Sequence, residues 1–460
     1  METPDEVGGI HCNYYMTYQQ VLDYLSSSEH LGIKFGLSNI KKLLRDIGFC
    51  YEKFRIIHIT GTNGKGSVAI FLSSILKEAG FRVGLYTSPH LVDFRERIQV
   101  DGSYISKRRV VELFPKLLFL TRTTRPELSV KPTYFEIMTA LALQYFSQAN
   151  VEIAILEVGM GGRLDATNVF KHSLVSIITN VDLEHTEYLG KKISDISREK
   201  AGIVKRNGIV ITGVKQRRAL EVIEGVCQKK KARLFLLGKD MNVQQVNQRR
   251  NDNDFCDFQK FDYQGIFNSF RDLKIKLLGR HQIENAGLAL GAIEALKLRG
   301  IPVTEKHLRK GLEKATWPGR LEVLNCVNWK GKDCRVVLDG AHNPAAIRCL
   351  KNAFLEGVIP HRRIILVLGI LKDKDVKKMV AEIVPLCQEV VVTSPRTERA
   401  FNKSLLRREI LKYLPSNRVR IGDGVEGALK KALEIANSDD LICVTGSLYT
   451  VGEARSALKV

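Results

Sequence analysis

The chain has 460 residues, of which 44% are hydrophobic and 26% charged, and its formal net charge is +21. This length predicts two or three domains, and the mixed composition excludes a fibrous or disordered chain. No apolar stretch is long enough to cross a bilayer, so we expect no membrane partner. The acidic residues 1–6 lack the features of a signal peptide, and we expect a cytoplasmic protein.

The positive charge does not identify a partner by itself. Lys and Arg are spread along the whole chain, and no basic stretch alternates with aromatic residues. Nine scattered cysteines without a CxxC pair indicate reduced thiols rather than a zinc site or a disulfide framework. We therefore expect a generally basic surface and no nucleic-acid partner.

Strands and helices alternate along most of the chain, which is typical of parallel sheets covered by helices. The first apolar strand is predicted at residues 56–60, followed by a Gly-rich turn and a helix that begins near Ser67 and stops at Gly80. The polar stretch 239–264 lacks a period and predicts a surface excursion or a hairpin insertion. Further strands are predicted at residues 82–87, 152–158, 174–180, 209–212 and 273–277, and a helix at residues 282–298.

A domain boundary is predicted at Thr316-Trp317-Pro318-Gly319, where Pro and Gly interrupt the helical pattern of residues 305–315. The α/β alternation restarts after it, with strands predicted at residues 335–339, 364–369, 389–393, 419–421 and 441–445. We therefore predict two α/β domains, residues 1–316 and residues 317–460.

The turn after the first strand has the residue types of a phosphate-binding loop: Gly61-Thr62-Asn63-Gly64-Lys65-Gly66-Ser67. Glycines let several backbone N–H groups point at one place, and the helix N-terminus and Lys65 add positive charge. Ser67 offers a hydroxyl to Mg²⁺. The segment departs from the strict P-loop pattern, because Ile59 replaces the first glycine and Gly66 is inserted between Lys65 and Ser67.

With its inserted glycine, this loop resembles that of the Mur ligase superfamily, and in particular of folylpolyglutamate synthase and dihydrofolate synthase. The resemblance spans residues 18–455, and the family's other motifs follow in order at residues 87–91, 94–98, 156–168, 182–186, 198–203, 281–286, 317–322, 339–344 and 445–449. It implies an α/β fold in which a P-loop-type ATPase domain with a mostly parallel sheet precedes a smaller Rossmann-like domain.

Three further residues are candidates for a metal centre. Glu157 ends an apolar strand, where open α/β sheets place ligand groups, and is either a Mg²⁺ ligand with Ser67 or a solvated carboxylate. The resemblance implies that His185 binds a second metal ion, and that Lys200 is carboxylated on its amine. Otherwise His185 is structural, and Lys200 is a phosphate contact or a surface charge. The implied cofactors are two Mg²⁺ ions, ATP as co-substrate and a monovalent cation.

The resemblance places Asn285 toward the nucleotide base and Arg320 toward its phosphates; otherwise Asn285 satisfies backbone groups and Arg320 bridges the domains. Asp339 lies three residues before His342 and could orient its ring and raise its basicity. Alternatively, Asp339 or Asn343 caps a helix. We predict Lys65, Lys200, Asp339 and His342 as catalytic residues, and as ATP-binding residues Thr62, Asn63, Gly64, Lys65, Gly66, Ser67, Asn285, Arg320 and Asp339.

On the folate side, the resemblance implies contacts from Ser88, His90, Arg95, Arg97, Arg163 and Asp165, although Arg95 and Arg97 could simply lie on a solvated loop. The implied reaction joins the carboxylate of dihydropteroate or a reduced folate to L-glutamate through an acyl phosphate, in a monomer that closes near Pro318. Three alternatives remain: a Mur ligase acting on a peptidoglycan precursor, a P-loop nucleotide-driven binding protein and a basic nucleic-acid-binding module. The sequence does not separate dihydrofolate synthase from folylpolyglutamate synthase activity.

Overall fold

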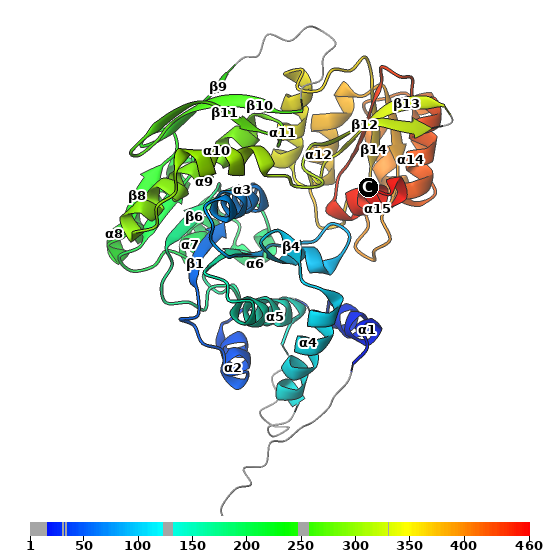
Figure 1. Cartoon of the computed structure of the whole chain (residues 1–460). Helices are drawn as coiled ribbons and strands as arrows, with labels where there is room; N and C mark the ends of the chain where they lie inside the picture. Colours follow the sequence, from blue (N-terminus) through cyan, green and yellow to red (C-terminus); the bar gives the residue numbers. More distant parts are fainter. Residues whose placement is uncertain (1–15, 30–31, 33–34, 123–131, 247–256, 330) are drawn as a thin grey trace, which may run out of the picture.

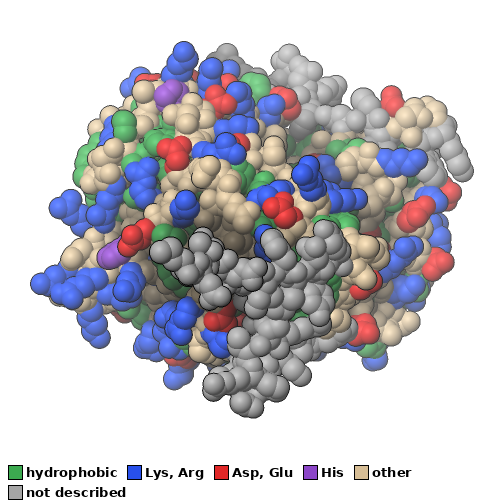
Figure 2. Space-filling view, turned by 60° about the horizontal axis from the view of Figure 1, so that its bottom comes forward, with side chains coloured by type: hydrophobic (Ala, Val, Ile, Leu, Met, Phe, Trp, Pro, Cys, Tyr) green, Lys and Arg blue, Asp and Glu red, His purple; other side chains and the backbone are tan. Residues whose placement is uncertain are grey.

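Three sheets organise the backbone of the computed structural model, which describes residues 16–29, 32, 35–122, 132–246, 257–329 and 331–460 (Figure 1). The acidic residues 1–6 lie outside the described residues. Lys and Arg side chains are spread over the face in Figure 2, with Asp and Glu between them, rather than gathered in one patch. None of the helices in the described ranges has both the length and the apolar character that a bilayer crossing needs.

The largest sheet has eight strands in the order β4-β3-β2-β5-β1-β6-β7-β8. Neighbouring strands pair in parallel along the run β2-β5-β1-β6-β7-β8. Strand β3 pairs antiparallel with both β2 and β4. The sheet is therefore mostly parallel, as predicted. The strands are β1 (Arg55–Thr60), β2 (Val83–Tyr86), β3 (Ile98–Val100), β4 (Ser103–Tyr104), β5 (Ile153–Glu157), β6 (Val175–Ile178), β7 (Ile209–Thr212) and β8 (Arg233–Leu236).

Helices cover both faces of this sheet, because successive side chains of its central strand β1 point to opposite sides. Ile57 and Ile59 pack with the helices of one face, whereas Ile56 packs with those of the other. The first face carries α3 (Lys65–Glu78), α9 (Arg280–Leu296) and α10 (Glu305–Lys314). The second carries α1 (Tyr18–Glu29), α2 (Ser38–Asp46), α4 (Lys107–Arg122), α5 (Tyr134–Gln148), α7 (Ile193–Ala201) and α8 (Arg217–Lys230), and the short α6 (Thr186–Leu189) precedes α7.

The predicted strands of residues 82–87, 152–158 and 174–180 are each shorter in the structure. Their last residues, Thr87, Val158 and Asn180, leave the ladder and begin loops at the carboxyl edge of the sheet. This edge is where open α/β sheets bind ligands.

A three-stranded antiparallel sheet contains the described part of the polar stretch 239–264. Its strands are β9 (Asn242–Val246), β10 (Gln259–Gln264) and β11 (Ser269–Ile275), and residues 247–256 between the first two lie outside the described residues. The predicted hairpin is thus confirmed for the described strands. The alternative prediction, a surface excursion, is wrong, because Phe261 and Tyr263 are buried against α9.

The six-stranded sheet has the order β12-β13-β17-β14-β15-β16 and is parallel except at β12, as in a Rossmann-like domain. Its last strand in the chain, β17, lies in the middle. The strands are β12 (Glu322–Trp329), β13 (Lys332–Leu338), β14 (Ile364–Leu368), β15 (Glu389–Val392), β16 (Val419–Ile421) and β17 (Leu441–Thr445). One face packs on α11 (Pro344–Leu355), α12 (Val376–Ile383) and α13 (Lys403–Ile410), and the other on α14 (Gly424–Ile435) and α15 (Leu448–Leu458).

A buried carboxylate fixes the three-stranded sheet to α9. Glu294 is 2% exposed, and its oxygens accept hydrogen bonds from the Tyr263 hydroxyl and from the backbone N–H groups of Ile266, Phe267 and Asn268. The Asn268 side chain also donates to it. Since α9 also carries Asn285, this anchor helps to position one wall of the candidate site.

We predict that Glu294→Ala destabilises the fold by about 3 kcal/mol or more, because the buried Tyr263 hydroxyl and several partly buried N–H groups lose their acceptor at about 1 kcal/mol each. The measurement is the urea midpoint of the unfolding transition. Glu221→Ala is the control, since this exposed residue of α8 pairs with Arg217 on the surface and its loss should change stability by about 0.5 kcal/mol or less. Equal midpoints for the two variants would contradict the anchoring role.

Candidate active site

The phosphate loop connects β1 to α3 and is held by the end of the neighbouring strand. The backbone N–H groups of Thr62 and Asn63 donate to Asn180 Oδ1 at 3.1 and 2.8 Å, and Thr179 Oγ1 donates to the carbonyl of Asn63 at 2.6 Å. Asn180 was not among the predicted site residues. Its position directly after β6 is the signal that could have identified it.

Two glycines of the loop are required by close neighbours. A Cβ atom on Gly64, which has φ +83°, would lie 2.4 Å from Asn285 Oδ1. A Cβ atom on the inserted Gly66 would lie 3.1 Å from Trp317 Nε1. The departure from the strict P-loop pattern therefore makes room for an indole ring that comes from the segment between α10 and β12.

Lys65 folds back over the loop. Its Nζ donates to the carbonyls of Gly61 and Thr62, both at 3.1 Å. Its charge lowers the pKa values of Glu157 and Glu184 and also those of His185 and Lys200. Lys65 is therefore the positive charge that these groups share.

A cavity of about 390 Å³ lies between the phosphate loop and the loop of residues 339–343, which joins β13 to α11. It brings together predicted residues from both ends of the chain, whereas Lys200, His90, Arg95, Arg163 and Asp165 are not part of its wall. The predicted residues that line it are Thr62, Asn63, Gly64, Lys65, Gly66, Ser67, Ser88, Glu157, His185, Asn285, Arg320, Asp339 and His342.

Glu157 ends β5 on the cavity wall and is 3% exposed. Burial raises the pKa of Glu157. The charges of Lys65 and Arg320 and a hydrogen bond from Ser88 N at 3.2 Å oppose this rise. Together with the Ser67 hydroxyl it provides hard oxygen donors, which fits a Mg²⁺ ion. The described residues contain no group of three or more His, Cys, Asp or Glu side chains that could hold a metal.

Glu184 lies between two histidines and was missed as an individual site residue. Its Oε1 is 3.7 Å from Nε2 of both His185 and His342. Burial favours a higher pKa for Glu184, but the neighbouring His342 ring and the charge of Lys65 hold it well below its usual range. Burial also lowers the pKa of His185 to about 4, against the effect of Glu184, so this ring is neutral at pH 7. The contact with His342 links the two large sheets.

The expectation that Asp339 orients the His342 ring is wrong. Both oxygens of Asp339 accept backbone hydrogen bonds, from Leu321 N at 2.8 Å and from Ala341 N at 3.0 Å. The His342 Nδ1 instead bonds to the carbonyl of Gly340 at 2.8 Å. The alternative of a helix cap is confirmed for Asn343, whose side chain accepts from Ala346 N at the start of α11.

Lys200 on α7 is 3% exposed, and its Nζ amine has no hydrogen-bond or ion-pair partner within the described ranges. Burial and the nearby charge of Lys65 lower its pKa to about 7, and Glu184 partly opposes them. A large fraction of this amine is therefore neutral at pH 7.

Asn285 and Arg320 both line the cavity. Asn285 Nδ2 donates to Gln282 Oε1 at 3.0 Å within α9. Arg320 packs so closely on Gly340 that a Cβ atom there would lie 2.4 Å from its Nη1. Its charge lowers the pKa values of Glu157 and Asp339.

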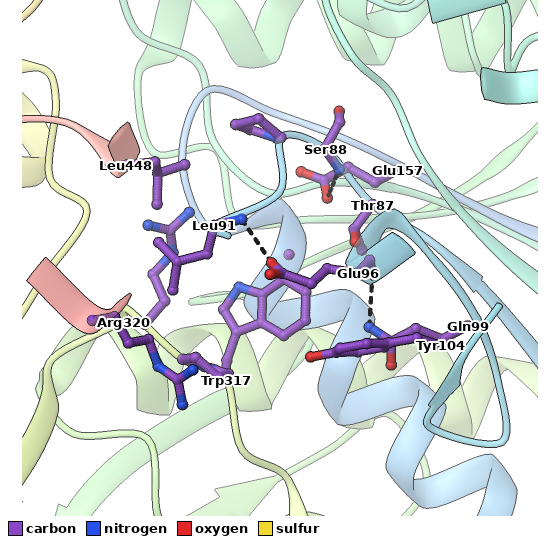
Figure 3. A pocket seen from close by; sticks show the side chains of 14 residues that line it. Thr87, Ser88, Leu91, Glu96, Gln99, Tyr104, Glu157, Trp317, Arg320 and Leu448 are labelled. Atoms are coloured by element: carbon purple, nitrogen blue, oxygen red, sulfur yellow. Dashed lines mark hydrogen bonds between the residues drawn. The ribbon is translucent and has the colours of Figure 1, made fainter. Parts of the chain in front are cut away.

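A second, smaller cavity of about 50 Å³ continues from Glu157 and Ser88 toward Trp317 (Figure 3). In Figure 3 the Trp317 ring lies between Arg320 and Leu448 on one side and Gln99 and Tyr104 on the other. Glu96 also lines it, and its carboxylate accepts from the backbone N–H groups of residues 91–93. Glu96 was not predicted, although it lies within the quoted motif 94–98.

The remaining folate-side candidates are engaged with protein groups. Arg97 Nε donates to His90 Nδ1 at 2.9 Å. Burial of the His90 ring and the positive charge of Arg97 lower the pKa of His90 to about 3. Arg95 pairs with Asp93 at 2.6 Å, and Arg163 with Glu199 at 2.9 Å. Asp165 accepts from Gly159 N, Met160 N, Thr167 N and the Thr167 hydroxyl, which folds the loop after β5. Substrate contacts by these residues stay predictions.

Comparison with known families gives two matches. The Mur ligase middle domain matches residues 59–293, and the glutamate ligase domain of Mur ligases matches residues 319–448. A Halobacterium salinarum protein, described as a probable bifunctional folylpolyglutamate synthase/dihydropteroate synthase, is 35% identical over 96% of this chain, which spans only 52% of that relative. The dihydrofolate synthase/folylpolyglutamate synthase of Bacillus subtilis is 32% identical over 97% of this chain and 100% of its own length.

Solved structures agree with these relatives. The Thermotoga maritima folylpolyglutamate synthase superposes with a TM-score of 0.81 at 37% identity, over 96% of this chain and 97% of its own. The Mycobacterium tuberculosis folylpolyglutamate synthase complexed with ADP has a TM-score of 0.87 at 30% identity, over 96% and 98%. A bifunctional folylpolyglutamate synthase/dihydrofolate synthase with Mn, AMPPNP and L-glutamate bound has a TM-score of 0.81 at 29% identity, over 97% of this chain and 100% of its own. The chain therefore belongs to the dihydrofolate synthase/folylpolyglutamate synthase family of Mur ligases.

Proposed function

We propose that the protein is an ATP-dependent ligase that joins the carboxylate of a pteroate or a reduced folate to the amino group of L-glutamate. The observation that carries this proposal is one cavity shared by the phosphate loop, the buried Glu157 and the loop 339–343 of the second sheet. Two related structures support it: the M. tuberculosis enzyme named as complexed with ADP, and a bifunctional enzyme named as bound to Mn, AMPPNP and L-glutamate.

The reaction has two steps. The terminal phosphoryl group of ATP passes to the substrate carboxylate, which forms an acyl phosphate and releases ADP. The glutamate amine then attacks the acyl carbon, so that a C–N bond forms, the C–O bond to phosphate breaks, and phosphate and a proton leave. Catalysis of this kind rests mainly on positioning and on neutralising charge.

The chain's own residues serve these two needs. Lys65 and the N-terminal N–H groups of α3 bind the phosphates, for which Lys65 exchanges its present contacts with Gly61 and Thr62. Arg320, which lines the same cavity, adds a second positive charge. Because the Nδ1 of His342 is engaged by Gly340, its Nε2 is the atom that can hold a proton or a hydrogen bond toward the reacting groups.

We assign a Mg²⁺ ion to Ser67 and Glu157, and a second ion to the neutral ring of His185, since a metal ligand must be unprotonated. When bound, the ions neutralise phosphate charge. Two metal ions and a monovalent cation stay predictions, as do the nucleotide contacts of Asn285 and Asp339.

Other expectations from the sequence also stay predictions. These are the division of the chain into residues 1–316 and 317–460, the monomeric state, the cytoplasmic location, and the absence of nucleic-acid and membrane partners. A further activity of a longer protein is not assigned, because the chain spans about half of the halobacterial relative.

Phosphate release from ATP tests the proposed reaction directly. With Mg²⁺ and L-glutamate, we expect turnover with dihydropteroate, with tetrahydrofolate or with both, and little turnover without an acceptor. Turnover with dihydropteroate alone identifies a dihydrofolate synthase, and turnover with both identifies a bifunctional enzyme. A folded protein that binds ATP but is silent with both acceptors would overturn the folate assignment.

For Lys200 we propose carboxylation of the amine, because a buried, partly neutral amine without a partner can react with CO₂ to give an anion near His185. Lys200→Ala should lose about 100-fold or more in kcat, the usual scale for removing a well-placed charged group, and acetate or formate should restore part of it. Lys205→Ala is the control: that lysine is largely buried but donates to Asn168 and Phe170. Acetate should not raise the activity of the control. An active Lys200→Ala variant would refute the proposal.

The same proposal predicts a pH dependence. Only the neutral amine reacts with CO₂, and the pKa of Lys200 is lowered to about 7, so the reactive fraction rises as the pH rises through 7. At constant dissolved CO₂, activity should increase by up to about tenfold between pH 6 and pH 8. Lys200→Ala rescued with acetate should lack this increase. An identical pH profile for the rescued variant and the unchanged protein would contradict the assignment.

A further inference from the structure

The loop that brings the second sheet to the phosphate loop is rigid in itself. Asp339 holds the backbone of Leu321 and Ala341, and the His342 ring is tied to the carbonyl of Gly340. The loop ends at Asn343, which caps α11 through a hydrogen bond from Ala346 N to its Oδ1 at 2.8 Å. This cap requires an acceptor, so the orientation of the Asn343 amide is determined by the helix.

The NH₂ group of the Asn343 amide contacts the phosphate loop. Its Nδ2 donates to Asn63 Oδ1 at 2.9 Å, and Asn63 Nδ2 points back at Asn343 Oδ1 at 3.4 Å. The two residues are 280 positions apart in the chain, and Asn343 is only 7% exposed. A reciprocal pair of this kind needs both amides in one relative position, since each side chain supplies a donor and an acceptor.

On the other side of the pair, the backbone of Asn63 is also fixed by hydrogen bonds. The Asn63 N–H donates to Asn180, and its carbonyl accepts from Thr179, so only the side chain of Asn63 is available for the crossing. Asn63 directly precedes Gly64, the residue before α3. The amide pair therefore joins two preorganised helix N-termini, those of α3 and α11, on either side of the cavity.

We propose that Asn63 and Asn343 form an interdomain latch that sets the closed position of α11 against the phosphate loop. They are positioning residues: the latch places His342, the residue next to Asn343, in the cavity. The proposal rests on the proposed function only in taking this cavity as the nucleotide site. Because the site is built from both domains, its apparent affinity for nucleotide scales with the fraction of molecules that are closed.

The latch is tested with variants that spare the helix cap. Asn343→Ser keeps a capping oxygen but is too short to reach Asn63, and Asn63→Ala removes the partner. The probe is the nonhydrolysable nucleotide AMPPNP with Mg²⁺, and its Kd is measured by calorimetry. Each variant should raise the Kd about tenfold, the scale of losing one or two amide hydrogen bonds. The double variant should be no weaker than the weaker single variant, because both changes break the same pair.

Asn402→Ser is the matched control. Asn402 caps α13 by accepting from Ser404 N and Leu405 N, so this change alters a cap without touching the cavity, and it should leave the Kd unchanged. In ligation assays the latch variants should raise the KM for ATP about tenfold and change kcat less than about twofold, because saturating nucleotide restores closure.

Additive losses in the double variant, or an unchanged Kd in either single variant, would overturn the latch. This binding measurement uses neither folate nor glutamate. A failure of ligation would therefore overturn the proposed reaction without altering the binding result, and a failed latch would leave the ligation result intact.

Discussion

The ammonium group of Lys65 is the charge on which the candidate site depends. It lies at the start of α3 and is bound to two carbonyls of its own loop. The same charge favours the anionic forms of Glu157 and Glu184 and the neutral forms of His185 and Lys200. Four side chains, two Glu, one His and one Lys, are thus biased toward the states that suit phosphate and metal chemistry. Removing this charge would alter all of them at once.

The second constraint is that neither large sheet contains the whole candidate site. The phosphate loop, Glu157 and Glu184 belong to the eight-stranded sheet, whereas His342 and Asn343 belong to the six-stranded sheet. Trp317, in the segment between them, packs on Gly66 of the phosphate loop. The segment between the two large sheets is therefore itself in contact with the phosphate loop.

Much of this arrangement could be predicted from the sequence, because strand ends and glycine-rich turns have strong local patterns. Glu157 and the phosphate loop lie where their positions after strands indicate. Side-chain partners could not be predicted in the same way. Spacing suggested that Asp339 orients His342, but the fold brings backbone N–H groups to both Asp339 oxygens. Asn180 and Glu184 act through residues far away in the chain, which only the assembled sheets make visible. In the polar stretch, Phe261 and Tyr263 alternate as in a strand, but intervening charged residues and the buried Gln259 obscured that pattern.

The position of β17 has a consequence for synthesis of the chain. This strand is the last one in the chain, with only α15 after it, yet it lies between β13 and β14 in the centre of its sheet. The eight-stranded sheet and its helices are complete by residue 314 and can fold while the remainder is still being translated. The six-stranded sheet, by contrast, has a gap at its centre until residues 441–445 have left the ribosome. A nascent chain can therefore present a phosphate loop well before it presents the opposing wall, and the complete cavity arises only in the finished polypeptide.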